Sequence, residues 1–160
     1  MQIIEYEDKY LEDIKDLLVE LEKYIISIDE DNLDRLHPEY RDKMAVLDLE
    51  EVKKNNGKCY LAVENEKAIG LIMGYVRTYD EYDYLDYKCP KSGEISELII
   101  SKEARGKGIG KQLMKKMENY FKSIDCEYVF LDVFAYNKNA VEFYKKEGYH
   151  SRMLIDVKRL

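Results

Sequence analysis

The sequence predicts one α/β domain over residues 1–160, built as a mixed β-sheet with helices on both faces. Three observations predict this class. Strand-like and helical segments alternate along the chain, a glycine-rich turn joins an apolar strand to an amphipathic helix, and no repeat or linker divides the sequence. With 46% hydrophobic and 37% charged residues, a chain of 160 residues can bury one substantial core.

The N-terminal part of the chain is expected to form a strand and two helices. Residues 2–6 are typical of a strand, and apolar residues at helical spacing predict a helix over residues 8–24. Pro38 suits the first turn of a second helix, over residues 39–55. Gly57 follows this helix, and we expect it to adopt the left-handed conformation that ends many helices.

The middle of the chain favours a hairpin and then a long loop. Residues 59–64 and 68–77 are strand-like, and the short polar segment 65–67 between them is typical of a tight turn. The polar residues 78–92 are expected to form a loop before the next apolar run, 94–100.

The C-terminal part alternates between helix and strand. After the glycine-rich turn Arg105–Gly110, one face of a helix carries apolar residues at helical spacing: Ile109, Leu113, Met117, Tyr120 and Ile124. A strand over 129–136, a helix that begins near Asn137 and a last strand over 149–157 complete the predicted order.

The glycine-rich turn is the strongest functional signal in the sequence. Between a strand and a helix, a turn that reads Arg105-Gly-Lys-Gly-Ile-Gly110 exposes backbone N–H groups at a helix start, where the helix dipole also favours an anion. Lys111-Gln112 follows Gly110, so neither the Lys-Ser/Thr of a Walker loop nor the third glycine of a dinucleotide fingerprint is present. The turn therefore predicts a phosphorylated ligand of another kind.

A second motif lies about thirty residues downstream. It reads Asn137-Lys-Asn-Ala140 and continues to Tyr144 and Gly148-Tyr149. Together with the glycine-rich turn, it resembles the GNAT superfamily of acetyl-CoA-dependent N-acetyltransferases, from Glu94 to about His150. The resemblance implies a βααβββαβαβ fold whose central strands splay apart. It also implies direct transfer of an acetyl group from acetyl-CoA to a primary amine, in a ternary complex.

The resemblance assigns acetyl-CoA to a particular set of backbone and side-chain groups. It places the pyrophosphate over the turn and pairs the pantetheine arm with the strand that precedes it. It also implies that Asn137 contacts that arm, whereas the residue type itself favours a cap of the helix that follows it. The implied cofactor-binding residues are Leu98, Ile99, Ile100, Arg105, Gly106, Lys107, Gly108, Ile109, Gly110, Lys111, Asn137 and Tyr144.

The same resemblance implies the catalytic groups. Tyr144 occupies the position of the general acid, because a phenol stays protonated at neutral pH and can donate to the leaving thiolate. The resemblance also implies a backbone N–H near Leu98 or Ile99 as the oxyanion donor. Glu97 is favoured as general base and Glu94 is second. Since these two acids have opposite parity on a regular strand, only one of them is expected to face the site.

The composition limits the partners and the cellular compartment that we expect for the protein. The net charge of −7 argues against nucleic acid and suits a cationic amine, either a small molecule or a peptide N-terminus or lysine. No apolar run reaches the roughly 20 residues that span a membrane. The three cysteines are far apart and match no metal motif, so we expect no metal, and we expect a cytoplasmic protein.

Several functional alternatives stay open at this point. Residues 79–87 mix four acids with four tyrosines, which favours recognition of a cationic amine; the alternatives are a surface loop or a contact in a homodimer. The chain is also compatible with a non-catalytic acyl-CoA-binding module or with an acyltransferase that uses a longer acyl group.

Overall fold

The computed structural model describes residues 1–160 and contains one five-stranded sheet with the strand order β1-β2-β3-β4-β5. The elements follow in chain order: β1 (Gln2–Glu5), η1 (Asp8–Tyr10), α1 (Leu11–Ile28), α2 (Tyr40–Lys54), β2 (Lys58–Glu64), β3 (Lys67–Val76), α3 (Asp83–Asp86), β4 (Ser92–Ile100), η2 (Lys102–Ala104), α4 (Ile109–Ser123), β5 (Tyr128–Leu131) and α5 (Lys138–Lys146). Neighbouring strands are antiparallel, except that β4 and β5 are parallel. The predicted mixed α/β sheet is confirmed.

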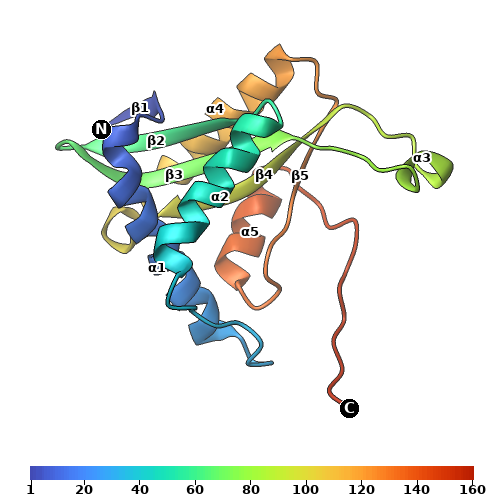
Figure 1. Cartoon of the computed structure of the whole chain (residues 1–160), viewed down its shortest axis with the longest axis horizontal. Helices are drawn as coiled ribbons and strands as arrows, with labels where there is room; N and C mark the ends of the chain where they lie inside the picture. Colours follow the sequence, from blue (N-terminus) through green and yellow to red (C-terminus); the bar gives the residue numbers. More distant parts are fainter.

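Helices cover both faces of the sheet, and the core is divided accordingly (Figure 1). On one face, α1 and α2 pack on the sheet through buried residues such as Ile14, Leu18 and Ala45. On the other face, α4 packs through Leu113 and Met117, and α5 joins it through partly buried aromatic residues. The two faces arise because the strands alternate: Leu61 of β2 belongs to the first cluster and its neighbour Ala62 to the second.

The predicted turn between β2 and β3 is present and has left-handed backbone at both central residues. Asn65 has φ 51° and Glu66 has φ 60°, as the twist of a two-residue hairpin favours. The expectation for Gly57 was wrong. Asn56 takes the left-handed conformation with φ 48°, and Gly57 instead lies so close to β3 that an added Cβ would collide with the Gly74 carbonyl.

Strand β4 is irregular at the point where it separates from β5. Its pairing with β3 skips Ser96: Ile95 lies opposite Gly74, and Glu97 lies opposite Met73. This is a β-bulge, which bends a strand and increases its local twist. The pairing with β5 ends at the same place, since Ile95 and Leu131 form its last pair, whereas β3 follows β4 as far as Ile100. The central strands therefore splay apart, as the resemblance implies.

The last predicted strand, residues 149–157, does not form. Helix α5 ends at Lys146, Gly148 turns the chain with φ 94°, and residues 151–160 are exposed without secondary structure. Figure 1 shows this segment running away from the body of the molecule.

None of the helices combines the length with the apolar character that crossing a lipid bilayer requires.

Candidate active site

The glycine-rich turn has the open backbone that anion binding requires. Gly106 and Gly108 have φ angles of 77° and 73°, which side-chain-bearing residues rarely adopt, and no atom lies within 4 Å of a Cβ built on either. The first donor of helix α4 is the N–H of Gln112, which reaches the Gly108 carbonyl at 3.3 Å. The amides of residues 109–111 therefore point out of the helix end without an intrahelical acceptor.

The charged residues of the turn are divided between protein contacts and solvent. Arg105 donates to the Ile100 carbonyl at 3.0 Å and pairs with Glu20 of α1 at 3.3 Å, so it anchors the turn to the rest of the domain. Lys111 pairs with Glu147 at 3.2 Å. Lys107 lies within the turn, is exposed and forms no ion pair, so its charge is free to contact an anion.

Asn137 is the N-cap of α5. Its side-chain oxygen accepts the Ala140 N–H at 3.2 Å and the Tyr24 hydroxyl at 3.4 Å. The capping role is thus confirmed, and it positions the start of the helix that carries Tyr144. A contact between Asn137 and a pantetheine arm stays a prediction.

The parity argument for the two candidate bases was wrong, because the bulge at Ser96 inserts one residue between them. Glu94 lies opposite Tyr75 and Glu97 lies opposite Met73, and both partners belong to the α1–α2 side of the sheet. Both acids therefore face the same side. Glu94 lies 3.6 Å from the Arg77 guanidinium, whereas Glu97 has no cationic partner.

Glu97 is the most perturbed acid of the molecule. Its pKa is raised to about 8, first by burial and then by the carboxylates of Asp48 and Glu22. Burial also raises the pKa of Asp48 to about 6, and one of its carboxylate oxygens is buried without a hydrogen-bond partner. We call Glu22, Asp48 and Glu97 the acid cluster; it joins α1, α2 and β4 on one face of the sheet.

Tyr40 lies within the acid cluster. The pKa of its hydroxyl is raised, first by burial and then by Glu22, Glu97 and Asp48. The sequence analysis missed Tyr40, Asp48 and Glu22. A signal for Asp48 is present in the sequence, since it falls in the stripe that Ala45, Leu49 and Val52 form along the core-facing side of α2. An acid in such a stripe is unusual unless it has a role or a partner.

Tyr144 of α5 packs on the α4 side of the sheet, opposite to the side that Glu97 faces. Burial raises the pKa of its hydroxyl to about 12, and the Glu97 carboxylate is the second cause. Its ring packs against Phe143 and Tyr149, with centroids 5.3 and 6.0 Å away. The Glu97 carboxylate is near enough to contribute to the raised pKa of Tyr144, so a group that stays protonated and an acid with a raised pKa lie in one region of the fold. This arrangement can supply a proton donor and a proton acceptor to one reaction.

The acids of the 79–87 loop are occupied with its own backbone. The Asp80 side chain accepts the N–H groups of Tyr82 and Asp83 at 2.8 and 3.0 Å, and the Asp83 side chain accepts the Asp80 N–H at 2.9 Å. These bonds stabilise the short helix α3. They give Asp80 and Asp83 a structural role that does not require a substrate.

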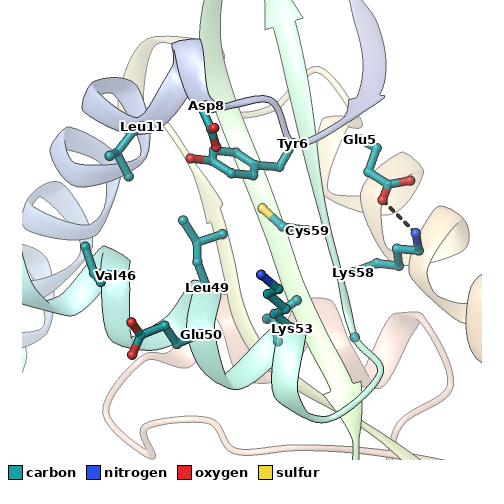
Figure 2. Close-up of a pocket in the computed structure, with 12 residues that line it drawn as sticks. Glu5, Tyr6, Asp8, Leu11, Val46, Leu49, Glu50, Lys53, Lys58 and Cys59 are labelled. Atoms are coloured by element: carbon teal, nitrogen blue, oxygen red, sulfur yellow. Dashed lines mark hydrogen bonds and ion pairs between the residues drawn. The ribbon is translucent and has the colours of Figure 1, made fainter.

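A separate cavity of about 430 Å³ lies between α2 and the β1–β2 edge (Figure 2). Tyr6 and Cys59 line its floor, and Glu50 and Lys53 line its rim. None of the predicted site residues borders it.

The chain is similar to known acetyltransferases. The acetyltransferase (GNAT) family model matches residues 22–149. An uncharacterized N-acetyltransferase of Methanocaldococcus jannaschii is 43% identical over 65 residues, which are 40% of this chain and 42% of that protein. The match thus spans less than half the length of that relative.

Solved structures share the whole fold. A tetramutant of a Bacillus halodurans protein matches with a TM-score of 0.82 at 18% identity, over 100% of both chains. An aminoglycoside N-acetyltransferase in complex with CoA matches with a TM-score of 0.68 at 16% identity, over 99% of this chain and 100% of that one.

Proposed function

This chain belongs to the acetyltransferase (GNAT) family, and from this premise we propose that it transfers the acetyl group of acetyl-CoA to a primary amine. The observation that carries the proposal is the end of the β4–β5 pairing at Ile95 and Leu131, with Glu97, whose pKa is raised, on one side of the sheet and Tyr144 on the other. An amine must lose a proton and a thiolate must gain one during this transfer, and the two residues match these needs.

Acetyl-CoA would bind along the open edge of β4 and over the glycine-rich turn. The amides of residues 106–111 would receive the pyrophosphate, and Lys107 would add a charge. Beyond Ile95, the β5-facing side of Leu98–Ile100 has no strand partner, so its backbone is free to pair with the pantetheine amides. Asn137 would contact the same arm at the start of α5.

The transfer would proceed in one ternary complex. The amine nitrogen attacks the thioester carbonyl, and Glu97 accepts the proton that the nitrogen loses, directly or through a water. A backbone N–H near Leu98 or Ile99 would stabilise the tetrahedral oxyanion. The carbon–sulfur bond then breaks, and Tyr144 protonates the departing thiolate. Glu94 is the less suited base, because Arg77 already neutralises it.

The acid cluster supports a cationic acceptor. Asp48 has a buried carboxylate oxygen without a partner, and a second ammonium group on the substrate would satisfy it. We expect Asp48→Asn to raise the acceptor KM by about tenfold, the equivalent of roughly 1.4 kcal/mol, while leaving the acetyl-CoA KM unchanged. Glu50→Gln, an exposed change on the same helix, is the matched control.

The experiment that tests the function is a panel of amines incubated with acetyl-CoA, with CoA release as the readout. Diamines, aminoglycosides, amino acids and peptides should be included, because the type of amine is the open question. Turnover with a diamine that exceeds turnover with the matching monoamine would support the role of Asp48. Longer acyl-CoA donors in the same panel test the alternative acyl group.

Cofactor binding can be tested before an acceptor is known. Acetyl-CoA at about 100 times its Kd should stabilise the fold by roughly 2.7 kcal/mol. Gly108→Asp should abolish this shift, since it adds a carboxylate and strain at φ 73°. A chain that shows the shift but acetylates no amine in the panel would be the non-catalytic acyl-CoA-binding module. A chain that shows no shift would contradict both functions.

We place this reaction in the cytoplasm. All three cysteines are free thiols, as a reducing compartment favours.

A further inference from the structure

Arg77 lies directly after β3, and two aromatic rings hold its guanidinium in place. The Cζ atom is 4.6 Å from the centre of the Phe130 ring of β5 and 6.0 Å from the centre of the Tyr79 ring. Stacking of this kind fixes the planar guanidinium and leaves its N–H edges open. The side chain keeps 39% of its surface exposed, so a ligand can reach those edges.

The protein does not use the N–H donors of this guanidinium. Arginine offers five of them in a planar fork. The side chains of Arg41 and Arg105 donate to protein oxygens, whereas that of Arg77 forms no hydrogen bond. Its ion-pair partner is Glu94, with 3.6 Å between Nε and Oε2. This distance exceeds the roughly 2.7–2.9 Å of a hydrogen-bonded charge pair, so the fork is free to bind an oxyanion.

Arg77 lies beside the opening between β4 and β5. Its two neighbours Glu94 and Phe130 are opposite each other in the parallel pairing, one pair before the pairing ends at Ile95 and Leu131. Ile95 and Leu131 contact the core cluster under α4. Because side chains alternate along a strand, Glu94 and Phe130 face the α1–α2 side, where the acid cluster also lies. The guanidinium is therefore on the same face of the sheet as Glu97.

The spacing between Arg77 and the acid cluster suits a small molecule. Glu94, beside the guanidinium, and Glu97 pair with β3 positions two residues apart, which is roughly 7 Å along the strand. Tyr75 of β3 lies between the two ends. The pKa of its hydroxyl is raised by burial and then by carboxylates that include Glu94 and Asp48. The Arg77 charge lowers the same pKa, so charges of both signs border one surface.

We propose that Arg77 binds a carboxylate of the acceptor, and that the substrate is a diamino carboxylate such as a free basic amino acid. One amine reacts beside Glu97, and the second ammonium group satisfies Asp48. The carboxylate pairs with the fork of Arg77, a bidentate geometry that a guanidinium provides and an ammonium does not. The reacting amine loses a proton and forms the amide bond, CoA leaves as the thiol, and the other two groups do not react.

This inference rests on the proposed acetyl transfer and on the ammonium site proposed at Asp48, and it adds the anionic end of the substrate. It separates the classes of amine that the function leaves open. Diamines and aminoglycosides carry the second ammonium group but no carboxylate, so they should bind more weakly than a diamino acid of matching length.

The test compares diamino acids with their own carboxamides at saturating acetyl-CoA, with CoA release as the readout. Lysine, ornithine and 2,4-diaminobutyrate cover three lengths, and each carboxamide keeps both amines and loses the negative charge. The best acid should have a KM about tenfold below that of its amide, the scale of one hydrogen bond to a charged group. Arg77→Gln should remove this preference by raising the KM of the acid, and the acetyl-CoA KM should stay the same. Arg77→Lys should restore part of the preference.

Glu94 gives a second prediction of opposite sign. Its carboxylate repels an incoming carboxylate and shares the charge of Arg77. Glu94→Gln should therefore increase the preference for the acid over its amide, whereas Arg77→Gln abolishes it. If the pair served only the stability of the fold, both variants would change the KM of acid and amide together.

Arg152→Gln is the matched control, because it also removes a guanidinium that stacks on a tyrosine, at 4.8 Å from the centre of the Tyr87 ring. It should leave the preference unchanged. Equal KM values for acid and amide in the wild type, or an unchanged preference in Arg77→Gln, would overturn the inference while acetyl transfer stands. If neither the acids, the amides nor any other amine of the panel is acetylated, the proposed function fails and the inference fails with it.

Discussion

Glu97 differs from the other strand acids because of where the bulge at Ser96 directs it. In the folded protein its pKa is about 8, against an ordinary value of 4.5, since burial and two neighbouring carboxylates disfavour its charge. At neutral pH it is therefore mostly protonated before substrate binds. In the mechanism that we propose, a cationic acceptor beside Glu97 would lower this pKa and allow the carboxylate to accept a proton.

The raised pKa of Glu97 predicts a pH-dependent stability of definite sign. Between pH 4.5 and 8 the folded state holds a proton that the unfolded state has released, so the free energy of unfolding should fall as pH rises through this window. Glu97→Gln should remove about 2 kcal/mol of that fall, since one pKa unit corresponds to about 1.4 kcal/mol and partial exposure reduces the full value. Denaturant unfolding from pH 5 to 9 measures both slopes. Parallel curves would show that Glu97 has an ordinary pKa.

Tyr144→Phe removes only the phenol oxygen. Its ring contacts with Phe143 and Tyr149 remain, so folding and acetyl-CoA affinity should change little. Turnover should fall by roughly 10²–10⁴-fold, the usual effect of losing a general acid. Pre-steady-state acetyl transfer to the best amine of the panel is the measurement. Tyr149→Phe is the matched control; an equal loss in both variants would indicate a packing role for Tyr144.

At the scale of single residues, the sequence predicted the positions that a motif defines. It did not predict the positions that depend on tertiary packing. The motif position of Asn137 predicted a helix cap, and the structure shows it; the role of Tyr144 at the gap stays a prediction. The predicted relative orientation of Glu94 and Glu97 was wrong, because no residue type in Glu94–Ile100 indicates a bulge. Asp48 and Glu22 come from helices far away in the sequence, so only the tertiary packing brings them to Glu97.

Among the elements, β4 and α4 depend on one close contact. Gly93 faces the Phe121 ring, and a Cβ at this position would overlap several ring atoms. Gly93→Ala should therefore lower the free energy of unfolding by about 1–3 kcal/mol, as overpacking does. Thermal unfolding without ligand measures the loss.

Gly110→Ala is the control for this contact. Its Cβ would lie 3.5 Å from the Phe143 ring, an ordinary contact, and its backbone is in the helical region. Stability should be unchanged or higher by up to about 1 kcal/mol. A larger loss for Gly110→Ala than for Gly93→Ala would contradict the packing that the structure shows.

Local patterns predicted most elements to within a few residues because periodicity and turn chemistry act locally. Helices α1 and α2 and the β2–β3 hairpin follow this rule. The strand expected at residues 149–157 shows its limit. The apolar alternation is present, but alternation alone does not make a strand: residues 151–160 pair with no segment, although the outer edge of β5 is open.

For the molecule as a whole, the distribution of charge matters more than its sum. The net charge of −7 suggested an acidic protein suited to cations. The structure concentrates a functional part of this charge in the acid cluster, while Asp80 and Asp83 serve a loop. The acceptor recognition that we propose for the acid cluster would therefore lie on the α1–α2 side of the sheet, away from the α3 loop.

The extra residue in β4 also has a genetic consequence. Ser96 has no partner in β3, so an in-frame deletion of its codon would leave Ile95 opposite Gly74 and Glu97 opposite Met73, with every side chain on its present face. The straightened strand would continue to pair with β5 past Leu131 and close the gap. We expect this deletion variant to fold and to gain no thermal stability from acetyl-CoA; a retained shift would show that the opening has another cause. A lineage of such proteins would thus be a single three-base event away from losing the opening between β4 and β5 while keeping its core.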